Sequence, residues 1–132
     1  MPHATRPWTL VHDVLNGYLH LGAALKMSPN SFSGSWNFAS GEEKSVEEVA
    51  RLLLSCFESH IGGIELSAAS NTFNEHAQLQ IDASKARSVL GWRCKDSLDN
   101  GLVSTANWYI NQDLGVDMDE YSKLFIQEYF SK

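Results

Sequence analysis

Short runs of strand-forming residues alternate with amphipathic helical segments along the chain, and this alternation constrains the fold more than any other feature. Such an order indicates helices packed on a small sheet. The predicted strands cover residues 8–11, 35–40, 64–67 and 77–82. The predicted helices cover residues from about 14 to 27, 46 to 58, 84 to 90, 98 to 109 and 117 to 130. We therefore predict an α/β fold with a small mixed sheet and packed helices, forming one domain over residues 1–132.

Polar residues stand where several of these helices should begin. Asp13 is the predicted N-cap of the first helix, because its side chain can accept from a backbone amide one turn later. Ser45 and Glu48 have the spacing of a capping box, in which each side chain accepts from the other residue's amide. The other predicted boundary residues are Asp96 or Ser97 and Asp117 at helix starts, and Gly91 at a helix end.

Charge and composition argue against several classes of function. The net charge is −6 and the pI about 5.2, and no stretch concentrates basic residues, so a nucleic-acid partner is not expected. The five histidines form no HxxxH or HExxH pair, and Cys56 and Cys94 fit no zinc spacing, so we predict no metal site and two free thiols. No apolar run is long enough for a membrane span and no secretory signal is recognised, so the expected location is cytoplasmic.

The motifs of several common enzyme classes are missing from the chain. It contains no G-x-G-x-x-G turn, no Y-x-x-x-K pair, no G-x-S-x-G elbow and no P-loop. Two pairs of adjacent carboxylates, Glu42-Glu43 and Glu47-Glu48, are interpreted as a solvated helix start favoured by the helix dipole. From the residues alone, no catalytic constellation is predicted.

Three segments nevertheless stand out together: ATRPW at 4–8, Asn74-Glu75-His76 leading into LQIDASKAR at 79–87, and SVLGWRC at 88–94. The last two can be explained by helix capping and packing alone. Arg6 differs, because a neighbouring proline restrains it at the start of a strand. Its planar guanidinium suits either a phosphate or a plain ion pair, and the residues alone leave both open.

The succession of motifs resembles a known family. ATRPW-x-x-V-x-D-x-L-x-G-Y-L is followed by G-x-W-N-F, S-V-E-x-V, D-x-S-K-A-R-x-x-L-G-W and a final T-x-x-W-Y. From about Ala4 to Tyr109 this resembles the C-terminal, substrate-binding part of CDP-glucose 4,6-dehydratases. These belong to the extended short-chain dehydrogenase/reductase, or NAD-dependent epimerase/dehydratase, family. In that family an NAD-binding domain precedes this part, so the resemblance implies a chain without it that binds no cofactor alone.

The resemblance also implies a binding site for a nucleotide sugar such as CDP-glucose. Arg6 corresponds to an arginine that contacts the pyrophosphate, and Trp8 would form a wall of the same cleft. Glu75 matches an acidic residue in a loop that also holds His76. The chain departs from the family at 71–74, where many relatives have a further arginine, and at Leu10, where the family often has histidine.

Three functions are compatible with these features. The first is a freestanding nucleotide-sugar-binding domain without catalysis of its own. The second is one half of a split dehydratase, working with a separate NAD-binding chain. The third is a self-associating interaction module that has lost its ligand. We predict a homodimer, formed by the N-terminal strand and helix together with Trp36 and Phe38, whose strand edge and apolar face would otherwise be uncovered. The alternative is a monomer in which the aromatic C-terminal helix folds back over this face.

Overall fold

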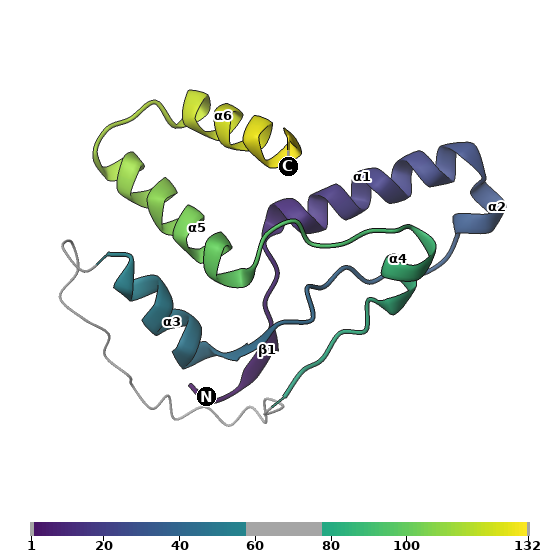
Figure 1. Ribbon diagram of the computed structural model, residues 1–132, viewed down its shortest axis with the longest axis horizontal. Coiled ribbons are helices and arrows are strands. Elements are labelled where there is room, and N and C mark those ends of the chain that lie inside the picture. The colour runs from purple at the N-terminus through teal and green to yellow at the C-terminus, as the bar shows by residue number, and fades with distance from the viewer. Residues whose placement is uncertain (1, 58–77, 132) are drawn as a thin grey trace, which may run out of the picture.

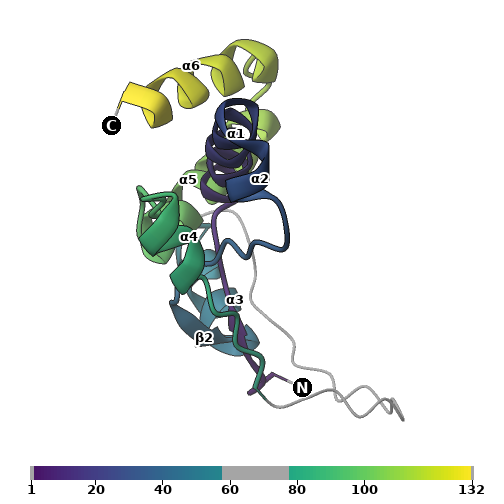
Figure 2. The same cartoon turned by 90° about the vertical axis from the view of Figure 1, so that its right-hand side faces the viewer.

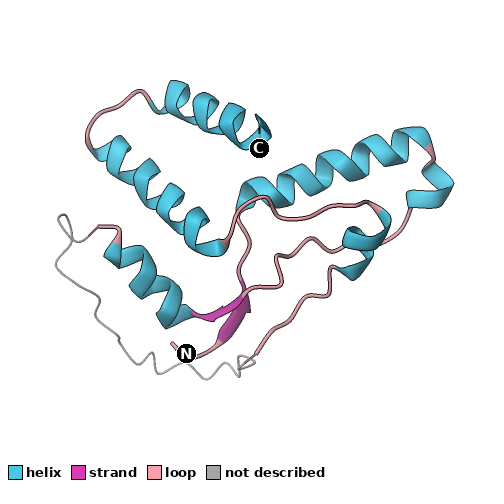
Figure 3. Cartoon of the chain, in the orientation of Figure 1, coloured by secondary structure: helices cyan, strands magenta, loops and turns pink. Residues whose placement is uncertain are grey.

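The computed structural model describes residues 2–57 and 78–131, and these form helices around a very small sheet (Figure 1). The predicted α/β class is confirmed, with helices contributing far more than strands (Figure 3). The elements in chain order are β1 (Thr5–Pro7), α1 (Val11–Met27), α2 (Pro29–Phe32), β2 (Glu43–Ser45), α3 (Val46–Ser55), α4 (Ser84–Val89), α5 (Leu98–Asp113) and α6 (Met118–Ser131).

The described sheet consists of β1 and β2, which pair in antiparallel fashion with Arg6 opposite Lys44. The first strand therefore lies at Thr5–Pro7, and the prediction of a strand at 8–11 is wrong. The Trp8 amide donates back to the Arg6 carbonyl at 3.1 Å, which turns the backbone out of the ladder before residue 9. The chain then enters α1 directly at Val11.

The predicted strand at 35–40 is also wrong, because this stretch pairs with no other strand among the described residues. Side chains hold it in place instead of a ladder. The Ser40 hydroxyl donates to the Trp8 carbonyl at 2.6 Å, and the Asn37 amide group donates to the Asp82 carbonyl at 3.1 Å. Residues 35–40 therefore alternate between polar and apolar side chains without being part of a sheet.

Of the predicted strand at 77–82, the structure retains one bridge, in which Gln78 pairs in parallel with Thr5. Residues 79–82 run past β1 without forming a strand, so this prediction is wrong beyond its first described residue. The predicted strand at 64–67 lies outside the described residues. The mixed sheet therefore shows both orientations, but as a short ladder and a single bridge.

The helix boundaries follow the capping predictions with one exception. Ser45 and Glu48 form the complete capping box of α3. The prediction of Asp13 as the N-cap of α1 is wrong, since α1 begins at Val11 and Asp13 lies inside its first turn. The N-cap is Leu10, whose side chain makes no capping hydrogen bond. Elsewhere the predicted boundary residues are confirmed: Ser97 caps α5, Asp117 accepts from the first amides of α6, and Gly91 follows α4 with a φ of +66°.

The buried core is built around Trp92, which is 1% exposed and follows α4. The Phe38 ring meets it edge to face with 5.0 Å between centroids. The Phe38 ring also lies over Gly17 of α1, where a side chain would collide with it. The small residues Ala39, Ala83 and Ala86 complete this cluster. The aromatic residues of the 36–38 segment therefore pack inward.

Figure 2 shows α1 and α6 toward one end of the molecule and the β1–β2 ladder toward the other. At the helical end, α5 and α6 follow one another beside the start of α1 (Figure 1). None of the helices within 2–57 and 78–131 combines the length and apolar character that a membrane crossing requires.

Candidate functional site

Arg6 lies in the middle of β1, half-buried, directly opposite Lys44 of β2. Residues that face each other across an antiparallel ladder point to the same side, so the two cationic side chains share one face. The Arg6 Nη1 atom donates to the Thr5 carbonyl at 2.8 Å. Lys44 pairs with the Asp99 carboxylate at 3.3 Å. This face of the ladder therefore carries two cationic side chains, and α5 contributes a carboxylate to it.

Trp8 is held beside this pair by two hydrogen bonds. Its indole Nε1 donates to the Lys44 carbonyl at 2.9 Å, and its own carbonyl accepts from the Ser40 hydroxyl. The ring is half-buried and is tied to the strand that carries Lys44. Arg6 and Trp8 therefore both contact β2, and their role as the pyrophosphate contact and the wall of one cleft stays a prediction.

Glu75 and His76, the other two predicted site residues, lie outside the described residues. The chain re-enters the described part at Gln78, beside Arg6's neighbour Thr5, where the Leu79 amide donates to the Thr5 carbonyl at 3.3 Å. The Gln78 side chain donates to Glu43 of β2 at 3.2 Å. The first described residues after this gap therefore lie beside the ladder that holds Arg6.

Glu47 and Glu48 lie in the first turn of α3, in agreement with their interpretation as a helix start. That interpretation is wrong for Glu42-Glu43, because Glu43 belongs to β2 and Glu42 directly precedes it. Glu48 accepts from the Ser45 amide, and this hydrogen bond lowers the pKa of its carboxyl group. Glu47 pairs with Arg51 one turn later at 2.7 Å. The Glu42 carboxylate accepts from the Leu98 amide at the start of α5 at 3.1 Å. The Glu48 and Glu42 contacts thus stabilise the starts of α3 and α5.

Asp13 is the residue whose role the sequence reasoning missed. It is 1% exposed, and its Oδ1 atom accepts from the Tyr129 hydroxyl at 2.6 Å and from the Lys95 amide at 2.8 Å. Its carbonyl accepts from the Trp92 indole at 3.0 Å. The only sequence signal was its position in the V-x-D motif, because its three partners come from distant parts of the chain.

Burial and the Asp13 carboxylate also govern the titration of the neighbouring groups. Burial raises the pKa of Cys94 to about 12, and the negative charge of Asp13 adds to the shift. Burial likewise raises the pKa of Tyr129, reinforced by its hydrogen bond to Asp13. A thiol with so high a pKa is almost wholly protonated at neutral pH and is a poor nucleophile. The cluster is therefore suited to holding elements together and not to covalent catalysis.

Cys56 and Cys94 are free thiols in the structure. Within 2–57 and 78–131, no group of three or more histidine, cysteine or acidic side chains is arranged to hold a metal ion. The residues between β1 and α1 show whether a dinucleotide could bind at this strand-to-helix connection. A dinucleotide needs a glycine turn between strand and helix, but this connection is Trp8-Thr9-Leu10, so its residues do not fit NAD.

No protein-family model matches the chain. One curated protein, a CDP-glucose 4,6-dehydratase from Salmonella typhimurium, is 30% identical over 132 residues. The chain is distantly related to this dehydratase. The match covers 98% of the chain but 36% of the dehydratase, so the chain spans about a third of the length of its relative. The predicted relation to these dehydratases is thus confirmed, while the assignment to their C-terminal part stays a prediction.

Proposed function

We propose that this chain is the nucleotide-sugar-binding part of a sugar-nucleotide dehydratase of the CDP-glucose 4,6-dehydratase type. Its relation to such a dehydratase supports the substrate class. The observation that carries the proposal is the paired placement of Arg6 and Lys44 on one face of the ladder, with Trp8 anchored beside them. In this proposal Arg6 contacts the pyrophosphate, and Trp8, Glu75 and His76 form the walls of the cleft.

The charges on the ladder favour an anionic ligand. Two like charges directly opposite each other across a ladder repel, and an anionic ligand would lessen this repulsion between Arg6 and Lys44. A pyrophosphate near Arg6 would accept hydrogen bonds from the guanidinium fork. Pro7 restrains the backbone next to Arg6, which reduces the entropy lost when a ligand orders the side chain.

The proposal includes no dehydration by this chain alone. The reaction needs a hydride acceptor and an acid–base pair, and the sequence contains neither the glycine fingerprint of an NAD site nor a Y-x-x-x-K pair. A separate NAD-binding chain would have to supply both, which is the split-enzyme alternative. A cytoplasmic location also remains a prediction.

Calorimetric titration of CDP-glucose into the purified chain tests the binding proposal. We expect saturable but weak binding, reduced about tenfold or more by Arg6→Ala, because charge-assisted hydrogen bonds are worth about 1.5–3 kcal/mol each. Arg93→Ala is the matched control, since Arg93 is an exposed arginine after α4. An affinity for CDP-glucose that Arg6→Ala leaves unchanged would show that the assignment of Arg6 is wrong.

Product analysis tests the catalytic half of the proposal. The pure chain, incubated with CDP-glucose and NAD, is expected to form no 4-keto-6-deoxy sugar. Adding a purified NAD-binding partner chain that restores product formation would favour the split-enzyme alternative. Product formed by the pure chain would contradict the proposal.

A further inference from the structure

Lys44 lies where its side chain can reach the same ligand as Arg6. The two residues are directly opposite each other in the β1–β2 ladder. Residues in this relation have Cβ atoms about 4.5–5.5 Å apart and point to the same side of the sheet. The Lys44 carbonyl accepts from the Trp8 indole at 2.9 Å, which ties its backbone to the residue proposed as a wall of the cleft. Both cationic side chains therefore start beside one part of the proposed nucleotide-sugar site.

The Lys44 ammonium is paired with a carboxylate of α5. Its Nζ atom lies 3.3 Å from an oxygen of Asp99. The Asp99 side chain is 62% exposed and the Lys44 side chain 29%, so water screens the attraction between them. Exposed ion pairs of this kind contribute little, because screening and the ordering of long side chains offset most of the attraction. Exchange of Asp99 for another anion therefore costs little.

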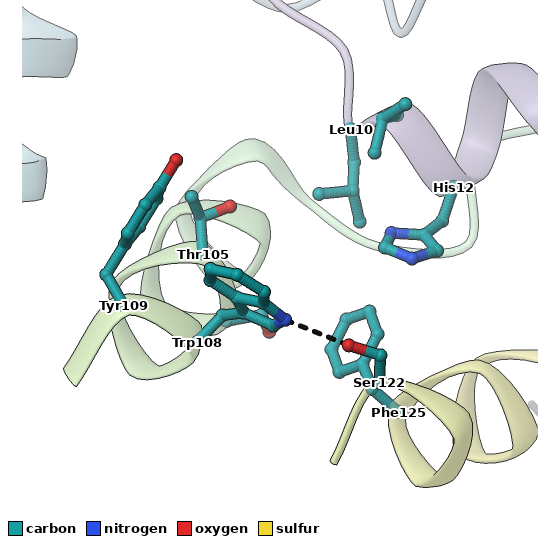
Figure 4. Close-up of a pocket in the computed structure, with 9 residues that line it drawn as sticks. Leu10, His12, Thr105, Trp108, Tyr109, Ser122 and Phe125 are labelled. Atoms are coloured by element: carbon teal, nitrogen blue, oxygen red, sulfur yellow. Dashed lines mark hydrogen bonds between the residues drawn. The ribbon is translucent and has the colours of Figure 1, made fainter. Parts of the chain in front are cut away.

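Helix α5 holds Asp99 in a fixed position. At the start of the helix, the Leu98 amide donates to the Glu42 carboxylate at 3.1 Å. Further along it, the Trp108 indole donates to the Ser122 hydroxyl of α6 at 3.0 Å, in the wall of a pocket between α1, α5 and α6 (Figure 4). Because α5 is attached at both of these points, the lysine, with its long flexible stem, is the partner better able to move.

A diphosphate group is well suited to displace the carboxylate from Lys44. It has anionic oxygens on two neighbouring phosphorus atoms, so one phosphate can pair with Arg6 while the other pairs with Lys44. Hydrogen bonds between two ionised groups are stronger than neutral ones, and the Asp99 carboxylate offers the lysine less negative charge than a diphosphate does.

We propose that Lys44 is a second contact for the diphosphate of the nucleotide sugar, and that Asp99 holds this lysine in the free chain. The inference rests on the proposed function, because it assigns two further residues to the same site. When the ligand binds, the ammonium moves from the carboxylate to the phosphate oxygens beside Arg6. Lys44 thus raises the affinity for the ligand, and Asp99 lowers it by competing for the lysine.

Calorimetric titration of CDP-glucose into variants of the full chain tests this exchange. Lys44→Met keeps an aliphatic side chain without the charge, and should weaken binding about tenfold, the ratio for one charge-assisted hydrogen bond. Asp99→Asn removes the competing carboxylate, and should tighten binding about threefold. In the double variant Lys44→Met/Asp99→Asn the Asp99 change should have little effect, because no ammonium is left for it to release.

An ion pair in α6 provides the matched control. Asp119 is the second residue of α6, as Asp99 is of α5, and it pairs with Lys123 at 2.6 Å. Asp119→Asn and Lys123→Met repeat the two charge changes in α6, at the end of the molecule away from the ladder (Figure 2). Both should leave the affinity for CDP-glucose unchanged. A loss in Lys123→Met equal to that in Lys44→Met would show an effect of overall charge and would overturn the contact.

The outcomes also separate this inference from the proposed function. Binding of CDP-glucose that Arg6→Ala weakens and Lys44→Met leaves unchanged would overturn the second contact but keep the nucleotide-sugar site. Equal tightening by Asp99→Asn with and without Lys44 would overturn the exchange of partners. The absence of saturable binding to the wild-type chain would overturn the proposed function, and this inference with it.

Discussion

The Asp13 carboxylate accepts a 2.6 Å hydrogen bond from the hydroxyl of Tyr129, 116 residues later in the chain. This contact fixes the end of α6 to the start of α1. The Lys95 ammonium donates to the Tyr129 carbonyl at 3.1 Å, and the Lys95 amide donates to Asp13 at 2.8 Å. The three residues thus join the first helix, the segment before α5 and the last helix into one buried polar network.

Removing the Tyr129 hydroxyl should destabilise the protein without disturbing its shape. We expect Tyr129→Phe to lower the free energy of unfolding by about 1.5–3 kcal/mol, the range for a hydrogen bond to a charged group. Tyr121→Phe, in the same helix, is the control, since the Tyr121 side chain is only partly buried. Urea unfolding of both variants measures the difference, and equal stabilities would contradict the role of the Asp13–Tyr129 bond.

Two glycines of α1 should respond in opposite directions to replacement by alanine. At Gly17 a Cβ atom would lie 2.7 Å from Cε1 of Phe38, so Gly17→Ala should cost roughly 1–3 kcal/mol of stability through overpacking. At Gly22 the same atom would meet nothing within 4 Å, so Gly22→Ala should stabilise the helix by roughly 0.5–1 kcal/mol. Thermal unfolding should order the proteins as Gly22→Ala, wild type, Gly17→Ala, and any other order would argue against the Phe38 contact.

The capping box of α3 should contribute measurably to stability. The Ser45 hydroxyl accepts from the Glu48 amide at 3.1 Å, so Ser45→Ala should cost about 1 kcal/mol. Ser55→Ala, at the opposite end of the same helix, should cost less because its hydroxyl donates to a carbonyl within the last turn. Denaturant unfolding of the two variants measures the contrast, and an equal cost would contradict it.

His12 should make the stability fall as the pH is lowered. Its folded-state pKa lies below 6.5 because of burial, so the unfolded chain takes up a proton at a higher pH than the folded chain does. The associated stability is present above about pH 6.5 and is lost as the pH falls through this range. Comparing unfolding at about pH 7.5 and about pH 5.5, we expect a smaller loss in His12→Phe than in the wild type. His20→Phe should keep the wild-type loss of unfolding free energy. If His12→Phe and His20→Phe lose the same amount between the two pH values, His12 is not the group responsible.

We expect the chain to form a homodimer through the exposed face of α1. Leu15, Tyr18 and Leu19 are between 50% and 62% exposed on this face, which is a large apolar surface for a helix in water. The strand edge predicted at 35–40 does not exist, and Phe38 packs inward, so α1 alone carries the expectation. A second copy can cover the face by two-fold symmetry.

Light scattering at micromolar concentration measures the association. Leu19→Glu should give the 14.7 kDa monomer, whereas His20→Glu, the next and also exposed position, should leave the dimer intact. A wild-type chain that scatters as a 14.7 kDa species would rule the dimer out.

Local chemistry made the helices predictable. The Ser45–Glu48 box, the Ser97 cap and the glycine after α4 each act within four residues, so the sequence alone indicated where α3 and α5 begin and α4 ends. The same holds for the α/β class, which follows from periodicity. Arg6 and Trp8 were chosen as candidate site residues from a contiguous motif, and their role in binding stays a prediction.

The strands and the buried polar network depended on tertiary structure. An alternating pattern at 35–40 or 77–82 forms a strand only when a partner backbone lies alongside. Side-chain hydrogen bonds hold residues 35–40 instead, and a single bridge at Gln78 is the strand pairing described for 77–82. The local sequence predicts that Asp13 caps a helix, but its actual partners Lys95 and Tyr129 lie 82 and 116 residues away in the chain. Backbone capping is decided within one turn of chain, whereas strand pairing and the burial of a carboxylate are decided by which distant segments the fold brings together.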